Sequence, residues 1–184
     1  DAGTGIGYTY MRIRGVDQTR INVTMNGVAI NDAESQGTWL VNLPDFGTHV
    51  TELNVQRGVG NSSNGSAAFG ASMNFKTRTP ETTPFLEIYS GAGSFSTFRN
   101  TITGATGYYK DRLATTFSYS NIYSKGYIQN ATAKLNSFYL SSELKLNDPQ
   151  KQSKRDHTLL FNLLTGSEKT GLAWNGVPSD MLES

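Results

Sequence analysis

Cysteine is absent from the 184 residues, which excludes a disulfide framework and thiolate metal sites. Long hydrophobic runs are also missing, since none approaches the roughly 18 residues that a membrane-spanning helix needs. No charge of one sign dominates, because 16 basic residues stand against 15 acidic ones. A formal charge of +1 gives no field that would attract nucleic acid, so we expect no nucleic-acid partner.

Residue patterns for catalysis or metal binding are equally sparse. The two histidines, His49 and His157, lie far apart and have no ligand-spaced companions. Asp32 and Glu34 lie in a polar stretch and show no arrangement typical of a general acid and base pair. The sequence therefore predicts no catalytic residue, no metal site and no cofactor, and we expect a protein that is not an enzyme.

Small and polar residues are what the chain has in abundance. Glycine occurs 19 times and hydrophobic residues make up only 36%, a composition that favours strands and turns over helices. Up to Pro80 the pattern predicts short strands at residues 11–15, 20–31, 51–58 and 71–77, with a hairpin turn at Asn26-Gly27. Residues 61–71 could form a short helical turn.

After Pro84 the predicted strands become longer and their side chains alternate. One predicted face carries Leu113, Phe117, Tyr119, Phe138 and Leu140, and the other carries Thr116, Ser118, Ser137, Tyr139 and Ser141. A tight turn at 108–112 contrasts with longer connections at 124–134 and after Gly166, which predicts short turns at one end of the strands and long loops at the other. Two architectures fit: an antiparallel sandwich that buries the apolar face, or a transmembrane barrel whose strands of roughly 9 to 11 residues expose it to lipid.

A family resemblance separates these architectures. The segments MRIRG, VTMNGVAIND, LPDF and VTELNVQRGVGNSSNGSAAFGASMNFKT, within residues 11–77, resemble in order and spacing the second half of the plug domain of TonB-dependent outer-membrane receptors. GAGSFSTFRN and SYSNIYSKGYIQN resemble the first barrel strands of that family. The implied fold is mainly β, with the C-terminal part of a small mixed plug domain at residues 1–80 and antiparallel strands of an incomplete transmembrane β-barrel at residues 81–184.

The resemblance also implies roles for individual residues. Arg14 and Arg57, each followed by glycine, match arginines that latch the plug to acidic residues of the inner barrel wall. Most of those partners are expected on strands outside this chain. Loops that match the plug apices facing the external ligand contain the predicted ligand-binding residues Asp17, Gln18, Glu34, Gln36 and Trp39.

The implied function is active transport across the bacterial outer membrane. The chain would be a fragment of a TonB-dependent transporter that imports a scarce nutrient of the siderophore-iron, haem or vitamin type. Its expected partners are TonB, through a box missing from this chain, an extracellular ligand such as a metal chelate, and outer-membrane lipid.

Two alternatives are open. A secreted or surface all-β adhesin or carbohydrate-binding module would bury the face of Phe117, Tyr119, Phe138 and Leu140, whereas a barrel would expose it. A β-barrel enzyme of the outer membrane is the weaker alternative, because the sequence contains no evident nucleophile and base.

Overall fold

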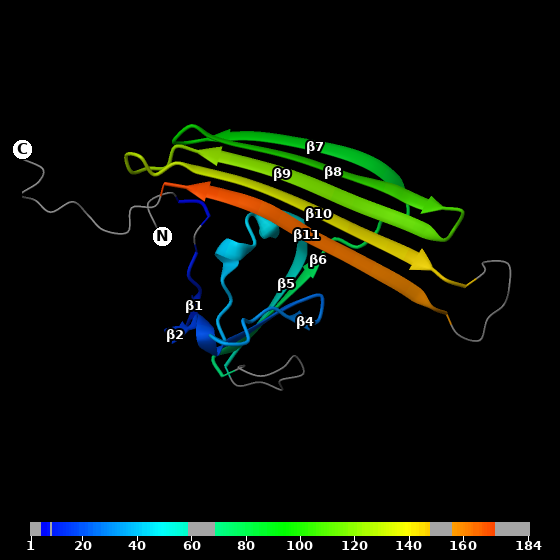
Figure 1. The fold of residues 1–184 in the computed structure, drawn as a ribbon, viewed down its shortest axis with the longest axis horizontal. Coiled ribbons are helices and arrows are strands. Elements are labelled where there is room, and N and C mark those ends of the chain that lie inside the picture. Colours follow the sequence, from blue (N-terminus) through cyan, green and yellow to red (C-terminus); the bar gives the residue numbers. More distant parts are fainter. Residues whose placement is uncertain (1–4, 8, 59–68, 148–155, 172–184) are drawn as a thin grey trace, which may run out of the picture.

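A computed structural model describes residues 5–7, 9–58, 69–147 and 156–171, and two β-sheets of different size form most of these described residues. A long five-stranded sheet, here the curved sheet, arches over a four-stranded sheet, here the small sheet (Figure 1). Within the described ranges, no helix is both long enough and apolar enough to span a membrane.

The small sheet has the strand order β4-β3-β6-β5. Its strands are β3 (Ile21–Met25), β4 (Val28–Ala29), β5 (Val50–Arg57) and β6 (Ala71–Thr77). β3 runs parallel to β6, and the other neighbours are antiparallel. Three short 3₁₀ helices precede β3 or β5, namely η1 (Gln18–Arg20), η2 (Leu40–Asn42) and η3 (Phe46–His49).

Local signals in the first 80 residues are mostly confirmed. Asn26 and Gly27 have φ values of 51° and 81° and join β3 to β4, as the hairpin prediction requires. The predicted strand at 11–15 is wrong in one respect, because Arg14 and Gly15 turn the chain between β1 (Arg12–Ile13) and β2 (Val16–Asp17). The predicted helical turn falls largely outside the described residues.

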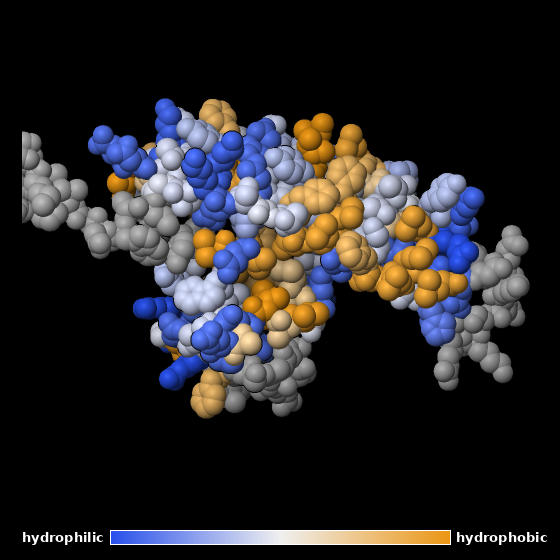
Figure 2. Space-filling view, viewed as in Figure 1, coloured by the Kyte–Doolittle hydropathy of each residue, from blue (hydrophilic) through white to orange (hydrophobic). Residues whose placement is uncertain are grey.

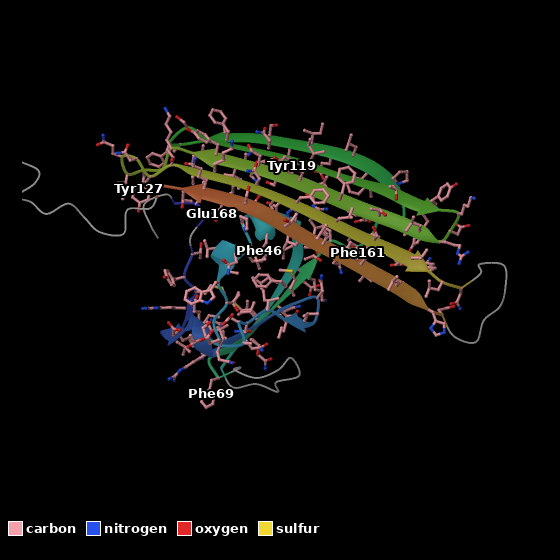
Figure 3. The ribbon with its side chains drawn as sticks, in the orientation of Figure 1. Phe46, Phe69, Tyr119, Tyr127, Phe161 and Glu168 are labelled. Carbon is pink, nitrogen blue, oxygen red and sulfur yellow. The ribbon has the colours of Figure 1, made fainter. Side chains whose placement is uncertain are left out.

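A compact apolar cluster explains why strands distant in sequence pair here. Ile21 and Val23 of β3 pack with Met73 and Phe75 of β6, and all four side chains are buried. The Phe46 ring stands edge-on to Phe75 with centroids 5.0 Å apart, between the two sheets in Figure 3. Burial of this cluster favours the parallel pairing of β3 and β6.

Gly70 directly precedes β6 and lies where the backbone packs closely against its neighbours. Its N–H donates to the carbonyl oxygen of Arg20 at 2.9 Å, and a Cβ atom on Gly70 would overlap the Val16 side chain. We expect Gly70→Ala to lower the free energy of unfolding by about 1–3 kcal/mol in urea titrations of the full-length protein. Gly47→Ala is the control, because a Cβ atom there meets nothing within 4 Å. Equal stability of the two variants would contradict the prediction.

The curved sheet is an antiparallel meander of long strands. They are β7 (Pro84–Gly93), β8 (Thr97–Tyr109), β9 (Leu113–Ser124), β10 (Ala133–Lys145) and β11 (Thr158–Thr170). The tight turn after β8 is confirmed, with φ values of 51° at Lys110 and 56° at Asp111. The predicted connection after Gly166 is wrong, because β11 continues to Thr170. Each end of the sheet has one short and one long connection, so the predicted separation by length is also wrong.

The two faces of the curved sheet differ as the alternation predicts. Ser118, Ser120 and Ser137 point toward the small sheet and are at most 1% exposed, whereas Tyr119 on the other face is 42% exposed. Inward hydroxyls pair across strands, as Thr103 does with Ser118 at 3.1 Å. Apolar side chains gather over the middle of the curved sheet, with hydrophilic ones toward its ends (Figure 2). The sheet therefore exposes its apolar face.

Candidate functional site

Tyr139 of β10 is the main polar contact between the two sheets. Its side chain is 1% exposed. Its hydroxyl lies 2.6 Å from Oγ1 of Thr77, 2.8 Å from the carbonyl oxygen of Arg78 and 3.0 Å from Oδ1 of Asn162. Because the Arg78 carbonyl oxygen and Asn162 Oδ1 only accept, the single hydrogen of Tyr139 goes to them. The Thr77 hydroxyl, which accepts from Asn26, can then donate to the Tyr139 oxygen.

His49 reinforces this contact from the end of η3. Its ring lies nearly parallel to the Tyr139 ring, with centroids 5.4 Å apart and planes 20° from parallel. Nε2 lies 2.8 Å from the Ser137 hydroxyl, and the His49 carbonyl oxygen accepts from the N–H of Arg78. One buried imidazole therefore connects the small sheet to two residues of β10.

Burial keeps the His49 ring neutral. Desolvation lowers its pKa from 6.5 to about 4. The Asp45 carboxylate opposes the shift, and the Arg78 and Arg99 guanidinium groups add to it. At neutral pH the ring is therefore a neutral hydrogen-bonding group.

A polar cavity of about 230 Å³ lies beside this contact. Thr48 and Arg78 line it from the first 80 residues, and Glu87, Tyr89 and Arg99 line it from β7 and β8. Arg99 donates to the Thr48 hydroxyl at 2.7 Å, and its guanidinium carbon lies 5.9 Å from the Tyr89 ring centroid. This part of the contact is therefore polar, whereas Ile6 packs against a buried apolar cluster of Ile122, Ala133 and Leu135 on the curved sheet.

No family model matches the chain, and no curated protein sequence matches it. Solved structures do match. The ferripyoverdine receptor of the Pseudomonas aeruginosa outer membrane is 16% identical over 78% of this chain, with a TM-score of 0.65. The siderophore receptor PiuA from Acinetobacter baumannii is 20% identical over 92%, with a TM-score of 0.63, and the copper transporter OprC is 16% identical over 93%, with a TM-score of 0.66.

The chain has the fold of part of a TonB-dependent outer-membrane receptor. The matched region spans 20% of the ferripyoverdine receptor, 22% of PiuA and 28% of OprC. The predicted mainly β fold class is confirmed, and Tyr139 and His49 lie where the first 80 residues meet the curved sheet.

The predicted latch arginines lie away from this contact. Arg14 and Arg57 are both exposed among the first 80 residues. Across the described ranges one ion pair forms, between Lys76 and Glu52 at 2.9 Å, and it includes neither arginine. Glu168 of β11 is a half-buried acid on the inward face of the curved sheet (Figure 3) and could in principle pair with an arginine. Its carboxylate lies beside Gly7, however, and forms no ion pair with Arg14 or Arg57 among the described residues. A latch through Arg14 or Arg57 stays a prediction.

Two predicted ligand-binding residues flank the start of η1. Asp17 is exposed and accepts a hydrogen bond from the N–H of Thr19, which holds the pKa of its carboxyl below the ordinary value. Gln18 is only 4% exposed, so its side chain is buried rather than on the accessible surface. Ligand contact by either residue stays a prediction.

The remaining three predicted ligand residues share one loop. Glu34, Gln36 and Trp39 are all exposed, and Trp39 donates from its indole to the Ser35 hydroxyl at 3.2 Å. Asp32 shapes this loop by accepting from the Ser35 N–H at 2.7 Å, and hydrogen bonds from Ser35 lower the pKa of its carboxyl. The structure thus brings Glu34, Gln36 and Trp39 together on one exposed loop.

Asn31 anchors that loop, and sequence reasoning missed it. Its Nδ2 donates to the carbonyl oxygens of Ile21 and Gln36, both at 2.8 Å, and its Oδ1 accepts from the Val23 N–H at 2.7 Å. We expect Asn31→Ala to destabilise the loop by about 1–3 kcal/mol, because these backbone groups lose their partner. Hydrogen exchange at Val23 in the full-length protein measures this effect.

A matched control for this prediction is Asn54→Ala. Asn54 is exposed on β5, and its side-chain amide donates to Glu52. Its loss is expected to leave exchange at Val23 unchanged. Unchanged exchange in the Asn31 variant as well would contradict the anchoring role.

Proposed function

We propose that residues 1–80 are the C-terminal part of the plug and residues 81–184 the first barrel strands of a TonB-dependent active transporter in the bacterial outer membrane. The observation that carries the proposal is the pairing of an exposed apolar outer face with a small, hydroxyl-rich inner face that contacts the plug. Lipid suits the outer face, and a hydrated seam suits the inner one.

The proposed cargo is a scarce nutrient carried as a metal chelate, haem or a vitamin. Solved structures of the same fold include receptors described by their siderophores and one described as a copper transporter. Ligand would bind from outside against the loop of Glu34, Gln36 and Trp39, and the protein would perform no chemistry on it. TonB would then pull on the plug and break the polar seam a few hydrogen bonds at a time.

The adhesin or carbohydrate-binding alternative fits the structure less well. It predicts that the outer aromatic face is buried against a second sheet. Tyr119 is instead 42% exposed, and Phe161 is 54% exposed. The second sheet of the described chain covers the opposite, polar face.

Growth tests the proposed transport. A receptor-deleted strain carrying the full-length gene is supplied with single sources of iron chelate, haem, copper or cobalamin. We expect growth on one class of source, and we expect it to require TonB. If the full-length gene improved growth of the deleted strain on none of these sources, the proposal would be contradicted.

A further inference from the structure

Charge is distributed unequally between the two faces of the curved sheet. Its five strands contain seven charged residues, of which Glu87, Arg99, Glu143, Lys145 and Glu168 lie in inward rows of the register. The other two, Lys134 and Lys169, alternate with buried or half-buried neighbours and are exposed on the outer face. On the described strands, the outer face therefore has two positive charges and no acid.

These two lysines are direct cross-strand neighbours. Lys134 of β10 pairs with Lys169 of β11 in the antiparallel register. Like charges opposite each other destabilise a sheet, and the outer face offers no carboxylate to compensate. An anion held between the two ammonium groups would remove that repulsion.

The lysine pair lies at one edge of the apolar band. From Lys134 to Leu144 the outward residues of β10 span ten positions, or about 33 Å along the strand and about 25 Å in height at a usual barrel tilt. That height equals the apolar band of outer-membrane barrels. Tyr123, which pairs with Lys134, supplies an aromatic side chain at the same level.

Polar side chains mark the same boundary on the neighbouring row. Asn121 donates to Asn136 at 2.8 Å, and Asn136 donates to the Ser167 hydroxyl at 3.3 Å. The next outward rows contain Phe138 and then Leu140 with Leu163. Cationic, polar and apolar rows thus follow one another, in the order of a lipid headgroup, its ester region and its acyl chains.

We propose that Lys134 and Lys169 bind the phosphate of an anionic lipid headgroup, whose acyl chains lie along the apolar rows. Charge complementarity and position at the edge of the band favour this occupant, because a lipid satisfies both sets of rows at once. The inference rests on the proposed function, which places the outer face in a membrane.

Vesicle binding with matched variants tests this site. The full-length receptor and its Lys134→Gln, Lys169→Gln double variant are each reconstituted in phosphatidylcholine vesicles with and without phosphatidylglycerol, and thermal unfolding is followed. We expect phosphatidylglycerol to raise the midpoint of the unmodified receptor, and the double variant to lose most of that rise. Lys125→Gln, an exposed lysine in the adjacent connection, is expected to keep it.

The possible outcomes separate the two proposals. A receptor that fails to insert even into phosphatidylcholine contradicts the proposed function. Insertion with an equal phosphatidylglycerol effect in the double variant overturns the lysine site alone. An equal rise with inorganic phosphate would also overturn it, because the site would then bind a free ion rather than a headgroup.

Discussion

Tyr139→Ala is expected to loosen the plug by about 3–5 kcal/mol, the usual cost of deleting a buried aromatic side chain. The substitution removes the ring under His49 and leaves Thr77 and Arg78 without their shared partner. Hydrogen exchange of residues 71–77 in the full-length receptor measures the loss, because opening of β6 limits that exchange. We expect exchange to accelerate at least about a hundredfold.

Comparison of Tyr139→Ala with Tyr139→Phe separates the contribution of the Tyr139 ring from that of its hydroxyl. Tyr139→Phe keeps the stack on His49 but removes the hydroxyl, so we expect a smaller loss of about 1–3 kcal/mol. Tyr123→Ala deletes a ring of the same size from the outer face of β9 and is expected to leave plug exchange unchanged. Plug exchange that stayed at the wild-type rate in both Tyr139 variants would show that Tyr139 does not seat the plug.

Local patterns predicted most of the fold. The Asn26-Gly27 turn is specified by two adjacent residues, and the two faces of β9 and β10 follow from strict alternation. The parallel pairing of β3 with β6 was not predicted, because it depends on burial between strands about fifty residues apart. The split of residues 11–15 was missed because Arg14 adopts a left-handed conformation that its residue type does not signal.

The plug contact was harder to predict, although one signal existed. Alternation placed Tyr139 among serines on the polar face, where a single large aromatic side chain is out of place. His49 was weighed only as a metal ligand, and its packing partner lies 90 positions away. Asn31 resembled an ordinary loop residue, since its bonds to Ile21, Val23 and Gln36 exist only in the folded plug. Contacts of this kind depend on tertiary structure.

Acidification is expected to weaken the contact that His49 makes between the plug and the curved sheet, here called the seat of the plug. Its pKa of about 4 when seated is below the ordinary 6.5, so a displaced plug takes up a proton between these values that the seated plug does not. The contribution of His49 to the free energy that holds the plug in place is therefore complete above about pH 6.5. It is lost as the pH falls toward 4, and the loss is at most about 3 kcal/mol. Protonation would be opposed by Arg78 and Arg99 and eased by Asp45.

Two substitutions isolate this titration. His49→Gln retains an amide that can reach Ser137 but cannot take up the proton, so we expect a weaker seat whose stability changes less between pH 7 and pH 5. His157→Gln removes the other histidine, which is exposed near the start of β11, and is expected to keep the wild-type dependence. Hydrogen exchange of residues 71–77 at several pH values, corrected for the intrinsic rate, measures both. If the His49 variant kept the full pH dependence, the imidazole could not be its source, and the role given to His49 would be contradicted.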